Sequence, residues 1–463
     1  MLQIEKKSHI HFIGIGGVGM SALAIILKQQ GYSISGSDSS ESQNTKKLSD
    51  LGIDITITHS KKNISKNTNY VVYTNAISDS NAEFLYAKEL NIPLIVRAEM
   101  LNFIGSHFFS IGVSGTHGKT TTTSMTAKIF LSAGLDPTLA VGGFLPEIQG
   151  AGYKGSGDTM IYEACEAFGS LNYLYPDVAL ITNIDEDHLD FFKNRQEVED
   201  LFLEYLNNHL APKSLLVWNA DDECLANVVS KSNITRKISV SIRANQGDFW
   251  IKNITLHEQS SEFDVYFGED FIGHFILGAP GIHNVSNSLL AIAIAKIQGV
   301  DNISIIKALK DFQNANRRFE IKNTSKKLTI IDDYAHHPRA ILLTLEAARK
   351  IATANNAKLI AIFQPHLYSR TQYFYKEFST SLLLADSVIL TDIYAAREKN
   401  EHNISSQLIY DEIYKQKQMD NLIFESEFNN IVNIVKKITL NQASVVITLG
   451  AGDVWKISEQ ICS

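Results

Sequence analysis

The stretch HFFSIGVSGTHGKTTTT, residues 107–123, predicts a strand, a glycine-rich turn and the first turns of a helix in one run. At the turn, Gly118, Lys119 and Thr120 supply the parts of a phosphate loop: backbone amides around a phosphate, an ammonium group that balances its charge, and a hydroxyl for Mg²⁺. The usual spacing of this motif requires glycine where Val113 stands, so the loop is shortened. A surface Gly-Lys-Thr turn is the alternative, but the flanking strand and helix favour the phosphate loop.

The rest of the chain alternates strand and helix patterns in three blocks. We place these blocks at residues 1–106, 107–316 and 317–463, and a chain of 463 residues is long enough for two to four domains. Such alternation predicts an α/β fold with parallel, doubly wound sheets. Residues 248–277 depart from it, because apolar and polar residues alternate there as in an antiparallel hairpin.

Composition excludes several classes of protein. The net charge of −8, from 50 acidic and 42 basic residues, leaves no electrostatic footprint for general nucleic-acid binding. The three cysteines lack close spacing, which argues against a disulfide framework or a zinc finger and favours a reducing compartment. The sequence contains no run of about 18 apolar residues, so it predicts no membrane-spanning helix. We therefore expect a cytoplasmic protein with neither a nucleic acid nor a membrane as its partner.

A second glycine-rich turn, GIGGVGMS at residues 14–21, follows the strand pattern HIHFI in the first block. Small residues there let backbone amides approach a diphosphate at the N-terminus of a helix, where the helix dipole favours anions. Asp38 ends the next predicted strand, at the position of a ribose-binding carboxylate. The residues alone leave three alternatives open: a dinucleotide, another diphosphate ligand, or a plain tight turn.

Acidic residues follow two predicted strands of the second block. Glu163 and Glu166 belong to EACEA, while Asp187 and His188 belong to TNIDEDHLD. Hard cations such as Mg²⁺ prefer carboxylate oxygens, and histidine is an acceptable further ligand. We therefore assign a metal to Glu166 and His188. A solvated acidic loop is the alternative for the carboxylates beside His188.

The third block carries candidate ligand-binding residues at the carboxyl ends of its predicted strands. They are Asp333, His336, His366 and Arg370. This edge is the usual ligand-binding edge of an open α/β sheet. Each histidine taken singly is better interpreted as a hydrogen-bonded structural residue, but the clustering with an aspartate and an arginine favours a functional site.

The order of these motifs along the chain resembles that of the Mur ligases, the ATP-dependent amino-acid ligases of peptidoglycan synthesis. The motifs that carry the resemblance are GIGGVGMS, GTHGKTTTT, TNIDEDHLD, GIHNVSN, RRFE, DDYAHHP, FQPHLYSRT and DIYAA. The resemblance extends from about residue 9 to residue 455 and is greatest to the alanine-adding members. It implies a Rossmann-like N-terminal domain for a UDP-sugar over 1–106, a central P-loop ATPase-type domain over 107–316, and a Rossmann-like C-terminal domain for the amino acid over 317–463.

The resemblance also implies roles for individual residues. Catalysis would involve Lys119, His188, Arg318, Asp333 and His336. ATP would bind to Gly115, Thr116, His117, Gly118, Lys119, Thr120, Thr121, His283, Asn284, Asn287 and Arg318. The UDP-sugar would bind to Gly14, Gly16, Gly17, Val18, Gly19, Met20, Ser21, Asp38 and Thr74, and the amino-acid side would comprise Tyr334, His336, His366 and Arg370. Mg²⁺ would be held by Thr120, Glu166 and His188.

Several positions depart from the pattern of the family, among them Cys165, Phe168 and Leu203. Cys165 and Phe168 stand where many members carry aspartate, which leaves Glu166 as the main acidic ligand. Leu203 stands where other Mur ligases carry a carbamylated lysine, and this absence fits the alanine-adding members.

The implied reaction joins L-alanine to the lactyl carboxylate of UDP-N-acetylmuramate through an acyl phosphate. ATP and Mg²⁺ are the implied cofactors, the partners are the two small substrates, and we expect a monomer or a homodimer. The closest rival is a ligase that attaches a recycled murein peptide to the same UDP-sugar. An NAD-dependent oxidoreductase would leave the phosphate loop unexplained, and a non-catalytic ATP-driven switch would hydrolyse ATP without ligation.

Overall fold

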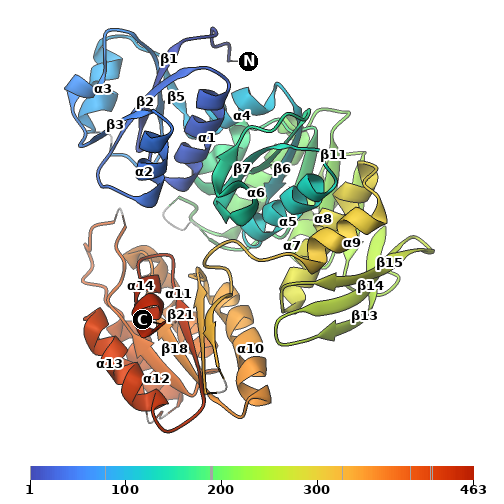
Figure 1. Ribbon diagram of the computed structural model, residues 1–463, viewed down its shortest axis with the longest axis vertical. Coiled ribbons are helices and arrows are strands. Elements are labelled where there is room, and N and C mark those ends of the chain that lie inside the picture. The colour runs from blue at the N-terminus through green and yellow to red at the C-terminus, as the bar shows by residue number, and fades with distance from the viewer. Residues whose placement is uncertain are drawn as a thin grey trace.

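The computed structural model describes residues 2–78, 80–187, 191–325, 327–396, 398–417, 419 and 421–462. Strands of these residues form three separate sheets, of five, ten and six strands, each accompanied by helices (Figure 1). This arrangement confirms the predicted α/β fold with three sheet-bearing regions. None of the helices in these ranges combines the length and the apolar character that spanning a bilayer requires.

The N-terminal sheet is parallel, in the order β3-β2-β1-β4-β5. Its order reverses at β1, so the glycine-rich turn after β1 lies at the switch point where open α/β sheets bind ligands. The strands are β1 (His9–Ile13), β2 (Ser33–Asp38), β3 (Asp54–Ile57), β4 (Thr68–Tyr73) and β5 (Leu94–Val96). The helices are α1 (Val18–Gln29), α2 (Gln43–Asp50), α3 (Ala82–Glu89) and α4 (Arg97–Gly105), with a 3₁₀ turn at Lys61–Asn63.

Helix α1 packs the N-terminal region against the central one. Its residues 20–27 are all buried, because the helix lies between β2 of its own sheet and strands β7 (Thr138–Leu145) and β8 (Gly150–Tyr153). Gly152 approaches so closely that a Cβ atom there would lie 2.5 Å from the backbone of Ala22. The two regions therefore pack backbone against backbone at this point.

The central sheet has the order β15-β14-β13-β12-β11-β10-β6-β9-β7-β8. The antiparallel pattern predicted over 248–277 is confirmed as β13 (Phe249–Leu256), β14 (Ser261–Phe267) and β15 (Asp270–Leu277), which extend one edge of the sheet. The remaining strands are β6 (Phe109–Ser114), β9 (Thr159–Glu163), β10 (Val178–Ile181), β11 (Leu215–Asn219) and β12 (Lys237–Ser241). The helices are α5 (Lys119–Ser132), α6 (Arg195–Glu204), α7 (Glu223–Lys231), α8 (Ile282–Ile297) and α9 (Asn302–Lys310).

The C-terminal sheet has the order β16-β17-β21-β18-β19-β20. Its edge strand β16 (Glu320–Thr324) runs antiparallel to β17 (Leu328–Asp333) and was not expected from the sequence. The other strands are β18 (Lys358–Phe363), β19 (Ser387–Leu390), β20 (Leu422–Phe424) and β21 (Ser444–Leu449). The helices are α10 (Pro338–Ala354), α11 (Tyr368–Leu382), α12 (Gln407–Gln416), α13 (Phe428–Thr439) and α14 (Trp455–Cys462).

The chain enters the C-terminal region through a strained segment. Arg317 and Phe319 have φ angles of 62° and 49°, which cost a non-glycine residue conformational energy. The guanidinium of Arg317 donates to Asp332, to Gly450 O and to Gly452 O, and these bonds fix the segment onto the sheet. This segment is the junction between the central and C-terminal regions. In Figure 1 the chain passes through it from α9 to the C-terminal sheet.

Candidate active site

The phosphate loop connects β6 to α5 and needs its two glycines. Gly115 has φ +119°, and a Cβ atom there would lie 2.2 Å from Thr182 Oγ1. Gly118 caps α5 with φ +82°, and its Cβ would lie 2.5 Å from Asn287 Oδ1. Backbone amides at the N-terminus of α5 are thus open to a phosphate, in the arrangement that favours anions.

Lys119 fills this loop with its ammonium group. Nζ donates to Thr116 O at 3.0 Å and to both carboxylate oxygens of Glu166 at 3.1 and 2.9 Å. Burial by itself would lower the pKa of Lys119, but the adjacent charge of Glu166 outweighs that effect and raises it. Lys119 therefore carries a positive charge where the phosphates of a nucleotide would lie.

Oxygen ligands suited to Mg²⁺ gather at the same loop. Thr120 Oγ1 donates to Glu163 at 2.8 Å, and Arg318 Nη2 from the inter-region junction reaches Thr120 Oγ1 at 3.4 Å. The oxygens of Thr120, Glu163 and Glu166 form a set of hard donors, which fits Mg²⁺ beside nucleotide phosphates. The third predicted ligand, His188, lies outside the described residues.

The N-terminus of α8 faces the loop from the other side. Asn284 is buried and donates to Pro280 O at 2.7 Å, while Asn287 contacts the loop near Gly118. Burial lowers the pKa of His283 to about 4, so its ring is neutral near pH 7. The structure therefore brings Asn287, one of the predicted nucleotide-binding residues, to the phosphate loop.

A group of three side chains joins the phosphate loop to the C-terminal region. His117, Asp185 and His337 each offer a ligand atom, and these atoms lie within 4.8 Å of one another. His117 Nε2 is 3.1 Å from Asp185 Oδ2, and Arg339 Nη1 is 3.4 Å from the same oxygen. The cation Arg339 accompanies that carboxylate, so we describe the group as a hydrogen-bonded junction between the phosphate loop and the C-terminal region.

A cleft of about 1020 Å³ opens where the three regions meet. Gly14, Gly16, Gly17, Val18, Gly19, Met20, Asp38 and Thr74 line it, as the sequence predicts for a UDP-sugar site. Asp38 accepts a hydrogen bond from Gly16 N at 2.8 Å. Ser21 is instead buried and donates to Val18 O at 2.9 Å. The glycine loop and Asp38, the carboxylate predicted to bind a ribose, therefore line the same cleft.

Among the lining residues that sequence reasoning missed, three carry chemistry suited to a ligand: His59, Arg97 and Tyr394. Arg97 begins α4, and its Nη1 lies 3.2 Å from where a Cβ of Gly19 would be, so its charge accompanies the glycine loop. Tyr394 belongs to the motif DIYAA and is contributed by the C-terminal region. All three residues follow predicted strands, and the carboxyl ends of parallel strands meet at one edge of a sheet. This placement was the signal from which the sequence could have predicted them.

Glu163 and Cys165 connect the cleft to the phosphate loop. Both line the cleft, and Glu163 also accepts the hydrogen bond from Thr120. The cleft therefore adjoins the phosphate loop at Glu163. This contact between the two sites is the geometric basis for chemistry between a nucleotide and the cleft's ligand.

The C-terminal region adds the predicted amino-acid side. The rings of Tyr334, His336, His366 and Tyr394 follow one another, with centroid distances of 5.3, 5.8 and 5.7 Å between neighbours. Both Arg317 and Arg318 lie over the ring of Tyr334, each 5.1 Å from its centroid. This row of rings runs from the inter-region junction to the cleft.

Asp333 and Arg370 have partners that sequence reasoning did not anticipate. Asp333 accepts from Phe319 N at 2.6 Å and from Ala335 N at 2.7 Å, and burial raises its pKa to about 6. Arg370 donates from Nε and Nη2 to Asp187 at 3.2 and 2.5 Å, across the interface between the central and C-terminal regions. Asp333 thus fixes the segment around Phe319, which connects the central and C-terminal regions, to the end of β17. Arg370 forms a buried ion pair with Asp187.

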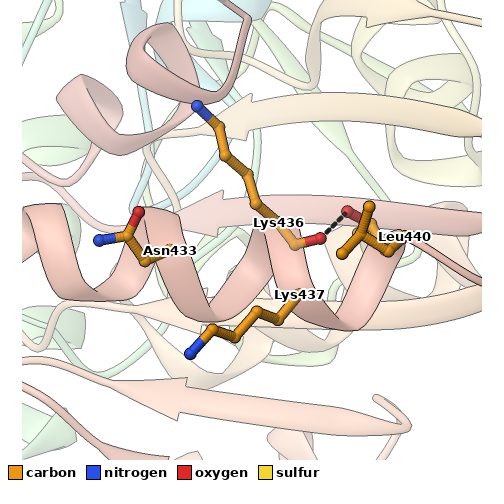
Figure 2. A pocket seen from close by; sticks show the side chains of 5 residues that line it. Asn433, Lys436, Lys437 and Leu440 are labelled. Carbon is orange, nitrogen blue, oxygen red and sulfur yellow. Dashed lines mark hydrogen bonds between the residues drawn. The ribbon is translucent and has the colours of Figure 1, made fainter.

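A second hollow, of about 700 Å³, lies on the outer face of α13 (Figure 2). Lys436 and Lys437 extend in different directions there, and Leu440 is exposed. None of the predicted site residues lines it. We assign it no part in the site.

Comparison with known proteins decides the family. Residues 9–109 match the model described as Mur ligase family, catalytic domain, residues 113–295 match the Mur ligase middle domain, and residues 317–452 match the Mur ligase, glutamate ligase domain. The chain belongs to the Mur ligase family. A Mur ligase named UDP-N-acetylmuramate–L-alanine ligase, from Clostridium acetobutylicum, is 44% identical to it over 99% of this chain and 98% of its own.

Solved structures of Mur ligases share the whole architecture. The UDP-N-acetylmuramate-alanine ligase of Thermotoga maritima has a TM-score of 0.82 at 27% identity, with 98% of each chain covered. A murein peptide ligase from Psychrobacter arcticus has the same fold, with a TM-score of 0.74 at 23% identity and 98% of each chain covered. The three sheets of this Mur ligase are therefore the family's three-domain fold.

Proposed function

We propose that this Mur ligase joins L-alanine to the lactyl carboxylate of UDP-N-acetylmuramate at the expense of ATP, releasing ADP and phosphate. The observation that carries this proposal is the contact between the two sites through Glu163, which faces the cleft and bonds Thr120 of the phosphate loop. The full-length similarity to alanine-adding ligases supports alanine over a recycled peptide as the second substrate. We further propose a cytoplasmic enzyme that acts as a monomer or a homodimer.

The first step activates the carboxylate. A carboxylate is a poor electrophile, so its oxygen attacks the γ-phosphate of ATP to give an acyl phosphate, and ADP leaves. Lys119 and Arg318 lie on either side of Thr120 and stabilise the charge that develops on the transferred group. When bound to Thr120, Glu166 and His188, Mg²⁺ would neutralise phosphate charge.

The second step forms the amide bond. The uncharged amine of L-alanine attacks the acyl carbon of the acyl phosphate, a tetrahedral intermediate forms, and phosphate leaves with the P–O bond intact and the C–O bond broken. The amine's surplus proton must leave to a nearby acceptor or to water. The row of rings from Tyr334 to Tyr394 reaches the cleft at Tyr394, and we place the incoming amine beside this row.

We assign His336 the orienting of the alanine amine as a hydrogen-bond acceptor, and we assign the removal of the amine's proton to water. Its Nδ1 lies 2.9 Å from Tyr334 O, and a carbonyl oxygen only accepts, so the proton is on Nδ1 and Nε2 keeps its lone pair. Burial, with a smaller contribution from Arg370, lowers the pKa of His336 well below its usual range. The ring is therefore neutral near pH 7 and orients the alanine ammonium as a hydrogen-bond acceptor. Asp333 is engaged by two backbone amides and positions the junction.

Replacing His336 with alanine should raise the KM for L-alanine about 10- to 100-fold, the loss expected for a hydrogen bond to a charged group. Because the pKa of His336 is lowered, the wild-type profile of kcat/KM for alanine should show no titration of this group between pH 6 and 8. His274→Ala, at an exposed histidine paired with Asp264, is the control and should leave KM unchanged. An unchanged KM and turnover in the His336→Ala enzyme would rule out this role.

The proposed reaction is tested by phosphate release. Wild-type protein is supplied with ATP, Mg²⁺ and UDP-N-acetylmuramate, then with L-alanine or a murein tripeptide, and the products are identified by mass. We expect release that depends on alanine, together with an alanyl adduct of the UDP-sugar. Preference for the tripeptide would indicate a recycling ligase, and release without any adduct would contradict ligation altogether.

A further inference from the structure

A buried carboxylate in the N-terminal region belongs to none of the motifs discussed above. Glu83 lies in the first turn of α3, and its side chain is 0% exposed. Burying a charged carboxylate is costly unless hydrogen bonds replace its water. Such a group is retained either to hold the fold together or to serve a site nearby.

Glu83 draws partners from several elements. One oxygen accepts from Ser60 N at 3.0 Å and from Asn63 Nδ2 at 2.5 Å, and the other accepts from Ser37 Oγ at 2.5 Å. His11 Nε2 of β1 lies 3.4 Å from that second oxygen. Burial alone would raise the pKa of Glu83, but these hydrogen bonds lower it to about 2. The group is ionised at neutral pH, and it ties the end of β2 to the loop after β3.

The same network fixes the ring of His59, which lines the cleft. Its Nδ1 lies 3.0 Å from Ser37 Oγ and 3.6 Å from Glu83, and 25% of its side chain is exposed. Ser37 has one hydroxyl proton, which it donates to Glu83, so Ser37 Oγ accepts from His59 Nδ1–H. In the neutral ring this leaves a lone pair on Nε2, for which the described residues provide no hydrogen-bond partner.

The place of His59 along the cleft indicates which part of a ligand it meets. The glycine loop follows β1, Asp38 ends β2, and His59 follows β3, so the three lie in order across the sheet edge β1-β2-β3. With a diphosphate at the loop and a ribose at Asp38, the next group in this direction is the nucleoside base. Uracil presents an imide N–H, a donor, whereas cytosine presents a ring nitrogen acceptor at the same position.

We propose that Glu83 is a positioning residue that holds His59, through Ser37, as the acceptor for the imide N–H of uracil in the UDP-substrate. The inference rests on the proposed function, because it takes the cleft to be the UDP-sugar site. The geometry selects a uracil nucleotide over a cytosine nucleotide, since cytosine would direct a lone pair at the lone pair of Nε2. Glu83 does not touch the ligand and acts only by orienting His59.

The test measures binding of UDP and CDP to the full-length protein by calorimetry, without turnover. Wild-type protein should prefer UDP. His59→Ala and Glu83→Gln should each weaken UDP binding about 2- to 10-fold, as for one neutral hydrogen bond, and should reduce the preference over CDP. The double variant should bind UDP no more weakly than His59→Ala alone, because Glu83 acts through that ring.

His9→Ala is the matched control. His9 lies on β1 of the same sheet and bonds Ser33 and Ser35, each at 2.9 Å, but does not line the cleft, so its replacement should leave UDP binding unchanged. Circular dichroism checks that each variant is folded, and His59→Ala, which leaves the buried carboxylate in place, tests the proposal should Glu83→Gln not fold. Unchanged UDP binding and base preference in His59→Ala would overturn the inference. Failure of wild-type protein to bind UDP at all would instead contradict the proposed function.

Discussion

Replacing Lys119 with methionine is expected to lower kcat about 10²- to 10³-fold, the loss found when one donor to a developing charge is removed. The ammonium of Lys119 is the fixed positive charge inside the phosphate loop, held by Thr116 O and Glu166. Methionine keeps the length and the packing of the side chain but removes that charge. Steady-state phosphate release at saturating alanine and UDP-sugar measures the effect, and KM for ATP is expected to rise as well.

Lys128→Met is the matched control for this prediction. Lys128 lies on the same helix α5, and its Nζ is 2.5 Å from Glu147, away from the phosphate loop. Its replacement should leave kcat within about twofold of wild type, because its ammonium pairs with Glu147 and is not among the groups at the phosphate loop. Thermal unfolding of both variants separates loss of charge at the loop from loss of fold. A Lys119→Met enzyme that is folded and retains wild-type kcat would show that phosphoryl transfer does not depend on this charge.

Replacing Arg370 with alanine is expected to lower the free energy of unfolding by about 3–5 kcal/mol, the usual cost of breaking a buried ion pair from one side. Arg370 and Asp187 have exposed side-chain fractions of only 5% and 7%, and the guanidinium donates to the carboxylate through two nitrogens. Removing Arg370 takes away the guanidinium that pairs with the carboxylate of Asp187 in a desolvated place. Because the partners belong to different regions, calorimetry should show the C-terminal region unfolding at a lower temperature.

Arg339→Ala serves as the comparison. Arg339 also pairs with the acidic loop of the central region, at 3.4 Å from Asp185, but 53% of its side chain is exposed. Its loss should cost less than about 1 kcal/mol, because water screens an exposed pair. The double variant Asp187→Ala/Arg370→Ala should regain much of the stability lost in Arg370→Ala, because the buried carboxylate is removed together with its guanidinium. Equal losses in Arg339→Ala and Arg370→Ala would contradict the role given to the buried pair.

The interface around this pair shows how the central and C-terminal regions meet. His337 Nε2 lies 2.8 Å from Glu186 O, and Tyr373 donates its hydroxyl to Glu186 at 2.8 Å. Three consecutive acidic residues, 185–187, thus contact the starts of α10 and α11. The order of motifs along the chain could not predict these pairings. The partners are 150 or more positions apart and meet only when both regions have folded.

Much of the site was predictable because its residues lie within single local motifs. The phosphate loop is one strand-turn-helix unit, and the positive φ angles of its two glycines are local to the turn, whereas the close approach of Thr182 and Asn287 to them is tertiary. The parallel order of the strands follows from the alternation of strand and helix, and it places Asp38 and the glycine loop at one edge. The antiparallel strands within 248–277 followed from the period of the apolar residues.

The amino-acid sequence by itself therefore determined the fold class, the phosphate loop and the family, because each depends on short-range patterns that few other structures satisfy. Tertiary structure alone decided which charges meet: that Arg370 faces Asp187, that both oxygens of Asp333 are bound to backbone amides, and that Glu83 lies behind His59. A carboxylate's role depends on its burial and on the donors around it, and both are set by packing between elements that are distant in the chain.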